Sequence, residues 1–242
     1  MSNLNMKSLI LFIVEGTSDK VYLSPIKKMV ERRSNSKIKF KVMYGDILTN
    51  FDTDPNYVEN EVAMVIQEYL ELFGLELEDI KQVVHIVDLD GCFVNSKKII
   101  NDKSLEKGHT IYYRDKIANF NRQNIIKRNQ KKVSCLEVLH KLNKINYGTK
   151  GMIPYRIYYF STNIDDYFFN NQNCSDEQKI NNSDLIHDKY IDNPEEYRHT
   201  IESNSCVPGS YDETWEYIKI KNNSLSRCTN FNKFFIEIID KL

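Results

Sequence analysis

The sequence lacks the cysteine patterns that staple small proteins or bind zinc. Its five cysteines are scattered and include no CxxC pair, and its five histidines do not fall at metal-binding spacing from them. This pattern argues against a disulfide framework and against a zinc ribbon, and it is typical of a reducing compartment. We therefore expect an intracellular, cytoplasmic protein.

Long apolar runs and an excess of one charge are also missing. The apolar run at residues 9–14 is far shorter than the roughly 20 apolar residues of a membrane span, and it does not have the form of a signal peptide. We therefore expect no membrane partner. Lys+Arg of 33 against Asp+Glu of 34 gives a net charge of -1, so a nucleic-acid site has to be a local patch.

The distribution of apolar residues predicts an α/β fold. Runs rich in β-branched and aromatic residues indicate buried strands, and apolar residues at helical spacing indicate amphipathic helices. The predicted strands cover residues 9–14, 38–44, 83–87 and 155–160, and the predicted helices cover residues 17–33 and 58–73. This alternation predicts a parallel sheet with right-handed crossovers, flanked by helices.

The same pattern divides the chain into three regions. An α/β core takes residues 1–91 and 152–166, and residues 92–151 form an insertion that we expect to be mostly helical and basic. Residues 167–242 form a mainly helical C-terminal region. The length of 242 residues is ample for a real hydrophobic core.

Acidic residues follow two of the predicted strands. Glu15 comes directly after the first strand, Asp88 and Asp90 end the third, and Asp19 lies in the first turn of the next helix. Ligands bind at the carboxyl ends of parallel strands, and a strand period of two would place Asp88 and Asp90 on one face. Converging carboxylates repel one another unless a cation neutralises them, and oxygen ligands select Mg²⁺ or Mn²⁺. We therefore predict a divalent metal site.

A structural reading of these acids stands beside the metal site. In it Asp88 caps a helix, Asp19 pairs with Lys20 or a distant arginine, and Glu15 is solvated. The position of all these acids at two predicted strand ends favours the metal site.

Two motifs together resemble the topoisomerase–primase (TOPRIM) domain. They are IVEGTSD at residues 13–19 and VDLDG at residues 87–91. In that family a Glu after the first strand and a DxD after the third bind Mg²⁺ for phosphodiester chemistry. The fuller EGxxD form is similar to nucleases of the overcoming-lysogenisation-defect type and to small TOPRIM effectors of bacterial antiphage systems.

The resemblance implies a TOPRIM-like core and a Mg²⁺- or Mn²⁺-dependent nuclease acting on DNA or RNA. Glu15 would be a metal ligand or the general acid–base, Asp88 and Asp90 metal ligands, and Asp19 a second acidic ligand. Some family nucleases use a later acidic residue, for which Asp165 and Asp166 are the candidates. They also use a lysine, which has no clear counterpart in the sequence.

The likeness to antiphage effectors also implies regulation. Such an effector would act in defence under the control of a separate ATPase, because the chain has no GxxxxGK[ST] motif of its own. The oligomeric state is open, with a homo-oligomer among the alternatives.

The insertion carries basic residues interleaved with aromatic ones. Lys127, Arg128, Lys131 and Lys132 form its densest cluster. Basic and aromatic side chains together are typical of surfaces that contact nucleic acid, so we predict a phosphate-contacting arm here. A solvated helix face is the alternative.

Two other functions stay open at this point. The DLDG motif followed by CFV also resembles the first motif of haloacid-dehalogenase-type phosphatases, in which Asp88 would be the nucleophile and Asp90 the acid–base. That motif normally sits on an early strand, which argues against this reading. The other alternative is a catalytically silent module that keeps the fold and binds nucleic acid or protein.

Overall fold

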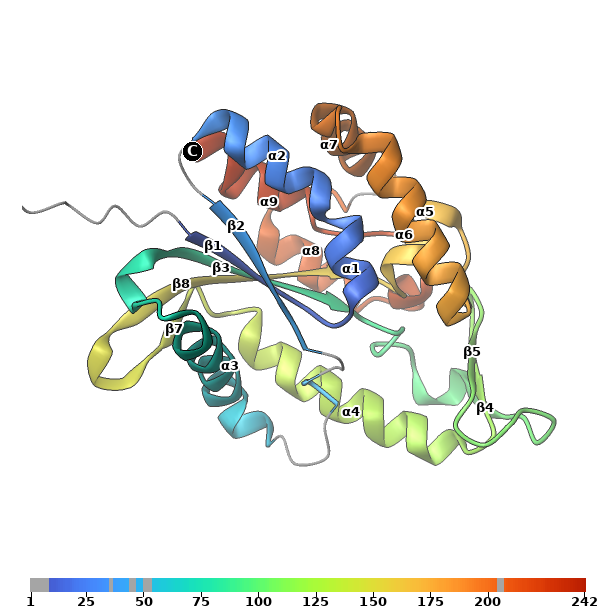
Figure 1. Cartoon of the computed structure of the whole chain (residues 1–242). Coiled ribbons are helices and arrows are strands. Elements are labelled where there is room, and N and C mark those ends of the chain that lie inside the picture. The colour runs from blue at the N-terminus through green and yellow to red at the C-terminus, as the bar shows by residue number, and fades with distance from the viewer. Residues whose placement is uncertain (1–8, 35–36, 44–46, 50–53, 204–206) are drawn as a thin grey trace, which may run out of the picture.

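A five-stranded sheet forms the centre of the computed structural model, which describes residues 9–34, 37–43, 47–49, 54–203 and 207–242. The strand order is β2-β1-β3-β8-β7. The strands are β1 (Leu9–Val14), β2 (Lys37–Val42), β3 (Ile80–Asp88), β7 (Lys144–Asn146) and β8 (Met152–Phe160). Four of them run parallel and β7 runs antiparallel to β8, so the predicted α/β fold is confirmed with a mostly parallel, mixed sheet (Figure 1).

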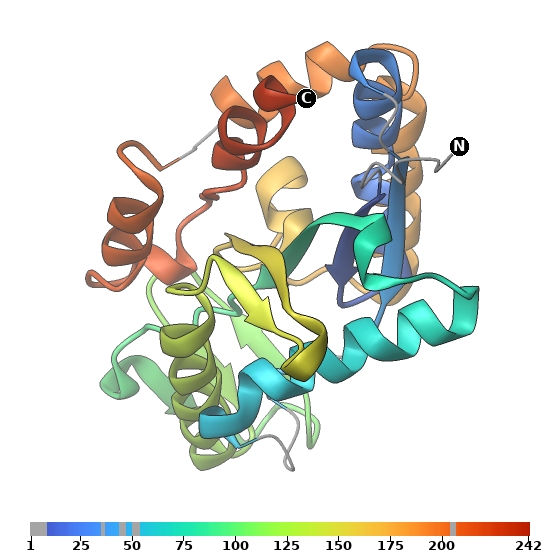
Figure 2. The ribbon, with the colours of Figure 1, turned by 90° about the vertical axis from the view of Figure 1, so that its left-hand side faces the viewer.

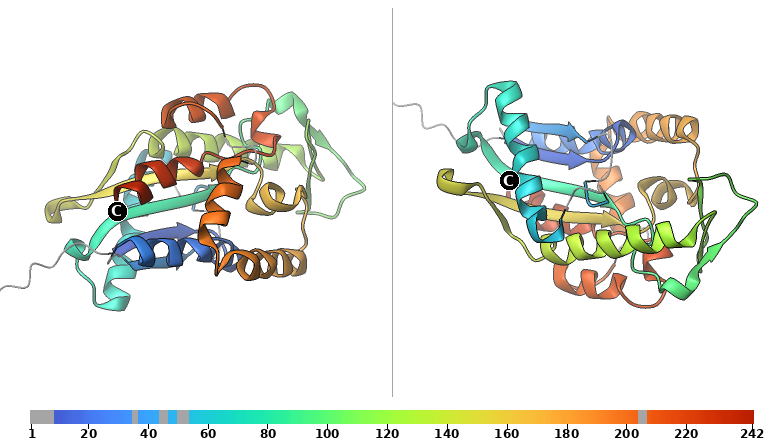
Figure 3. Two further views of the ribbon diagram at one scale, coloured as in Figure 1. Left: turned by 90° about the horizontal axis from the view of Figure 1, so that it is seen from above. Right: turned by 90° about the horizontal axis from the view of Figure 1, so that it is seen from below.

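Helices cover both faces of this sheet (Figures 1 and 3). On one face lie α1 (Thr17–Tyr22), α2 (Ser24–Arg33), α5 (Ile164–Phe169), α6 (Asp176–Tyr190), α7 (Pro194–Ser203), α8 (Tyr211–Ile218) and α9 (Asn232–Glu237). The other face is covered by α3 (Val58–Phe73) and α4 (Arg122–Leu139), which contact each other beneath the sheet (Figure 2). Within the described ranges, no helix combines the length and the apolar character needed to cross a membrane.

Short 3-10 turns connect several of these elements, at Pro55–Tyr57, Leu77–Asp79, Ser96–Lys98, Gly148–Lys150, Asn223–Leu225 and Ile239–Lys241. All six residues of β1 are buried, as expected for a strand covered on both faces. Phe234 of α9 meets Phe12 of β1 with ring centroids 5.4 Å apart. The mainly helical C-terminal region therefore shares one core with the sheet.

The single helix predicted after β1 is interrupted. Leu23 separates α1 from α2, and Pro25 stands in the first turn of α2. Proline has no N–H group and its ring clashes with the preceding turn, so a continuous helix cannot pass this point. The hydroxyl of Ser24 donates to the carbonyl oxygen of Val21 at 2.7 Å and satisfies an acceptor that the break exposes.

The insertion differs from the expectation that most of it is helical. Its long helix α4 is present, but a second sheet precedes it, with β4 (Ile99–Asn101), β5 (Thr110–Tyr112) and β6 (Ile117–Asn119) in the order β4-β6-β5. Each strand has only three residues, which is too short for a period-two pattern to be recognised in the sequence. This small sheet projects beyond the carboxyl ends of the central strands (Figure 1).

The turn after Asp90 gives a first testable prediction. Gly91 has φ of +64°, and a Cβ atom placed on it would lie 2.3 Å from Cδ2 of the buried Leu225. We expect Gly91→Ala to lower the free energy of unfolding by about 2–4 kcal/mol, through backbone strain and overpacking. Gly108→Ala is the control, because its φ is +90° but no atom lies within 4 Å of the new Cβ. Equal losses for the two variants in urea unfolding would contradict this account.

Candidate metal centre

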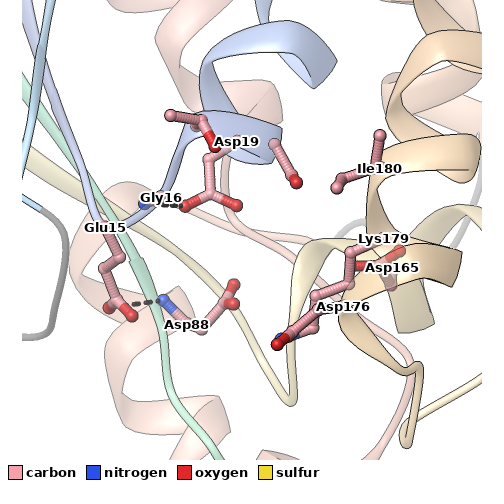
Figure 4. Close-up of a pocket in the computed structure, with 10 residues that line it drawn as sticks. Glu15, Gly16, Asp19, Asp88, Asp165, Asp176, Lys179 and Ile180 are labelled. Atoms are coloured by element: carbon pink, nitrogen blue, oxygen red, sulfur yellow. Dashed lines mark hydrogen bonds and ion pairs between the residues drawn. The ribbon is translucent and has the colours of Figure 1, made fainter.

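Glu15 and Asp88 meet where the paired strands β1 and β3 end. The backbone N–H of Asp88 donates to Oε1 of Glu15 at 3.3 Å. On its other side, Oδ1 of Asp88 accepts a hydrogen bond from the N–H of Ile164 at 3.1 Å, at the start of α5. Both carboxylates are thus oriented by backbone groups, and this part of the predicted constellation is present (Figure 4).

Asp19 lines the same cavity, which has a volume of 330 Å³. Its Oδ2 accepts a hydrogen bond from the N–H of Gly16 at 2.8 Å, so the first turn of α1 fixes the side chain. Figure 4 shows the carboxylates of Asp19 and Asp88 pointing toward a common space, with Asp176 and Lys179 of α6 across from them. Two strand ends and the helices α1, α5 and α6 therefore line this acidic cavity.

Of the two later acids, only Asp165 reaches the cavity. It is buried, and its Oδ1 accepts hydrogen bonds from the hydroxyl of Tyr22 at 2.7 Å and from Nδ2 of Asn182 at 3.0 Å. Asp166 instead forms a bidentate ion pair with Arg114, both N–O distances being 2.6 Å. Asp166 therefore ties the insertion to α5 and does not serve as a ligand in this cavity.

Asp90 does not line the cavity, contrary to the expectation that it faces the same way as Asp88. Strand β3 ends at Asp88, and Asp90 has φ of +51°, so the strand alternation does not extend to it. Its Oδ2 accepts a hydrogen bond from Nζ of Lys132 at 2.8 Å, and its Oδ1 accepts one from the hydroxyl of Tyr112 at 3.4 Å. The left-handed turn thus turns this carboxylate toward α4.

Lys132 is the residue that the sequence reading misplaced. We predicted a phosphate contact, but its side chain has no exposed surface, and Nζ lies 4.0 Å from Oε1 of Glu15 as well as 2.8 Å from Asp90. A signal for this position exists, because α4 buries residues at helical spacing. They are Ile125, Asn129, Lys132, Cys135, Leu136 and Leu139.

The charges of the site divide into two groups. Burial and the neighbouring carboxylates of Asp19, Glu15 and Asp90 raise the pKa of Asp88 well above its usual range. Burial, followed by the charge of Asp165, raises the pKa of Asp19 to about 6, although the N–H of Gly16 opposes this. For Asp90, burial favours protonation, but Lys132 and Arg128 outweigh it and lower the pKa.

The side chains that line the cavity fit the ligand preference of a hard divalent cation. Glu15, Asp19, Asp88 and Asp165 offer only oxygen atoms, which suit Mg²⁺ or Mn²⁺. A bound cation would relieve the repulsion that raises the pKa values of Asp19 and Asp88. Asp90 does not fit the set, because an ammonium group already neutralises it. In the described ranges no three side chains of Asp, Glu, His or Cys form a ready-made metal cluster.

The structure therefore brings Glu15, Asp19, Asp88 and Asp165 to one cavity and places Asp90 beside it.

Comparisons with protein-family models, curated proteins and solved structures find no match to this chain. The assignment of the site rests on its residues and their geometry.

The raised pKa of Asp19 predicts a pH dependence of stability. The folded protein holds the proton on Asp19 more tightly than the unfolded chain, in which the pKa of this group is 3.8. The stabilisation that the bound proton contributes is therefore lost as pH rises from about 4 to about 6. If the site binds a metal, the cation would take the place of this proton above that range. We expect Mg²⁺ to raise the melting temperature more at pH 7.5 than at pH 5.

The matched variants are Asp19→Asn, which should reduce both effects, and Asp188→Asn, an exposed acid on α6 that should change neither. An equal Mg²⁺ shift at both pH values would contradict the assignment of Asp19.

The buried ammonium group gives a stability prediction. Lys132→Met leaves Asp90 without its partner, and we expect the free energy of unfolding to fall by about 3 kcal/mol. Lys127→Met, on the exposed face of the same helix, should have little effect. Adding Asp90→Asn to Lys132→Met should restore part of the loss, because the uncompensated charge is then gone. Additive losses in the double variant, measured by urea unfolding, would show that the pair does not interact.

Proposed function

We propose that this chain is a metal-dependent nuclease that hydrolyses phosphodiester bonds in DNA or RNA. The observation that carries the proposal is the group of carboxylates of Glu15, Asp19 and Asp88, which share one strand-end cavity where the pKa values of Asp19 and Asp88 are raised. Such a set binds a hard cation, and a hard cation clamps phosphate oxygens.

The residues of the site would have separate roles in the reaction. Glu15 and Asp88, with Asp19 or Asp165, would hold Mg²⁺ or Mn²⁺, which would supply charge stabilisation at the scissile phosphate. Glu15 would be the alternative candidate for the general acid–base, because its carboxylate lies at the same strand end as Asp88. Lys132 would position Asp90 and Glu15, since its Nζ lies 2.8 Å from the first carboxylate and 4.0 Å from the second.

A groove next to the site supports nucleic acid as the substrate. Lys127, Arg128 and Lys131 line a cavity of 730 Å³ between α4 and the small sheet. Arg128 donates to the backbone oxygen of Asp90 at 3.3 Å, so this groove adjoins the motif that ends β3. Basic side chains along a groove bind the phosphates of a polynucleotide and position it.

The regulatory part of the proposal rests on the motif resemblance. The segments IVEGTSD and VDLDG are similar to those of TOPRIM effectors in antiphage systems. By this likeness the nuclease would be a defence effector, and a separate ATPase would control when it cuts.

The geometry favours the nuclease over the phosphatase alternative. A haloacid-dehalogenase mechanism needs Asp88 as nucleophile and Asp90 as acid–base at one reacting centre. Asp90 is instead paired with Lys132 and lies outside the lining of the acidic cavity. The silent binding module would have the same fold, and activity measurements separate it from the nuclease.

The decisive test is cleavage by the purified protein with Mg²⁺ or Mn²⁺, on DNA, RNA and a generic phosphomonoester. We expect cleavage of a nucleic acid, and a loss of about 100-fold or more for Asp88→Asn and for Glu15→Gln. Asp188→Asn controls for the loss of an acidic residue elsewhere.

Full metal-dependent cleavage by Asp88→Asn would refute the assignment. Turnover of the monoester alone would establish the phosphatase. The absence of both cleavage and Mg²⁺-induced stabilisation would point to the binding module.

A further inference from the structure

A second basic groove lies at the exposed edge of the central sheet, and we call it the edge groove. It has a volume of 540 Å³ and is bounded by α1, α2, the edge strand β2, α3 and the end of α6. Lys20, Lys27, Lys28 and Lys39 line it, against the single acid Glu31, which is a local excess of three positive charges. Because the net charge of the chain is -1, this excess is a property of the surface and not of the composition.

The ion pairs of Lys27 and Lys28 are exposed and weak, so a ligand can compete for both ammonium groups. Lys28 lies 2.7 Å from Asp192, whose side chain is 91% exposed, and Lys27 lies 4.0 Å from Glu31 in an exposed pair. Exposed pairs contribute little to stability, so a phosphate can replace the carboxylate at small cost. The edge groove can therefore present its ammonium groups to a polyanion.

Aromatic rings stand beside the lysines. Phe73 of α3 is 58% exposed, and its ring packs on the buried ring of Tyr69 with centroids 4.7 Å apart. Phe40 of β2 lines the same groove. Exposed rings next to ammonium groups are the pattern that binds single-stranded nucleic acid, because bases stack on the rings while phosphates contact the cations. A duplex offers its phosphates but keeps its base faces stacked inside.

The edge groove and the acidic cavity are lined by different residues of the same two helices. On the α1 side, Asp19 lines the cavity and the next residue, Lys20, lines the groove. On α6, Lys179 lines the cavity and His187 lines the groove, about 12 Å further along the helix. Figure 1 shows α1 starting at the carboxyl end of β1, where the cavity lies. A strand bound in the groove would therefore lie along helices that also line the cavity.

Protection of the sheet edge explains only part of this surface. Lysines on an edge strand prevent association with other sheets, and Lys37, Lys39 and Lys41 alternate along β2 in that way. Lys20 and Lys27 lie on helices and have no such role. Edge protection also gives no reason for the exposed ring of Phe73.

We infer that the edge groove binds single-stranded nucleic acid, with phosphates on Lys20 and Lys39 and a base on Phe73. The delivery of this strand to the acidic cavity rests on the proposed nuclease function. The binding itself does not depend on cleavage, so it can be measured separately.

The test is a titration of the full chain, in EDTA, against fluorescent oligothymidylate and against a duplex of the same length. We expect Phe73→Ala, and separately Lys20→Ala with Lys39→Ala, to weaken binding of the single strand about tenfold. Leu72→Ala is the control for Phe73, because it is 73% exposed on the same helix and does not line the groove. Lys144→Ala with Lys150→Ala controls for charge at the opposite sheet edge.

Phe73→Ala should leave duplex binding unchanged. The inference is overturned if the groove variants bind oligothymidylate as the wild type does. It is also overturned if the lysine variants aggregate without a change in affinity, which would indicate edge protection alone. Cleavage assays on the same variants separate the two proposals, since weakened binding without any nuclease activity supports the groove and refutes the nuclease. Nuclease activity in groove variants that bind the single strand as the wild type does would support the nuclease and refute the groove.

Discussion

The parallel pairing of β1 with β3 is the constraint on which the site depends. Two strands that run the same way end at the same edge, so the residues that follow them meet although they are far apart in the chain. Glu15 and the backbone of Asp88 are in hydrogen-bonding contact for this reason. The helices then complete the site, because α1 supplies Asp19 and α5 orients Asp88 through the N–H of Ile164.

Charge is distributed unevenly around this edge. The side next to α4 is neutralised, since Lys132 is buried between Asp90 and Glu15. The side next to α1 and α6 has several carboxylates, and the pKa values of Asp19 and Asp88 are raised there. The buried Lys132 thus lowers the pKa of Asp90, whereas the carboxylates of Asp19 and Asp88 still repel their acidic neighbours. The same sequence segment, DLDG, thus serves two different electrostatic environments.

Two basic grooves lie on the same molecule as the acidic cavity. One is lined by α4 and the small sheet, and the other follows α1, α2 and the edge strand β2. A polyanion that approaches the carboxylates of the cavity would be repelled by them unless a cation offset the repulsion. The insertion contributes to this arrangement because Arg114 pairs with Asp166 and fixes it against α5.

The sequence by itself determined the local features, since these depend on neighbouring residues. The apolar run of β1, the helix α3 that ends at Gly74, and the positions of Glu15 and Asp88 at strand ends could all be predicted from it. Only the tertiary structure decided the contacts between distant segments. Lys132 reaches Asp90 across 42 positions and Arg114 reaches Asp166 across 52, and no local pattern records which acid a distant cation will neutralise. The three-residue strands of the insertion were equally hidden, because their stability comes from pairing with one another and from packing against α4.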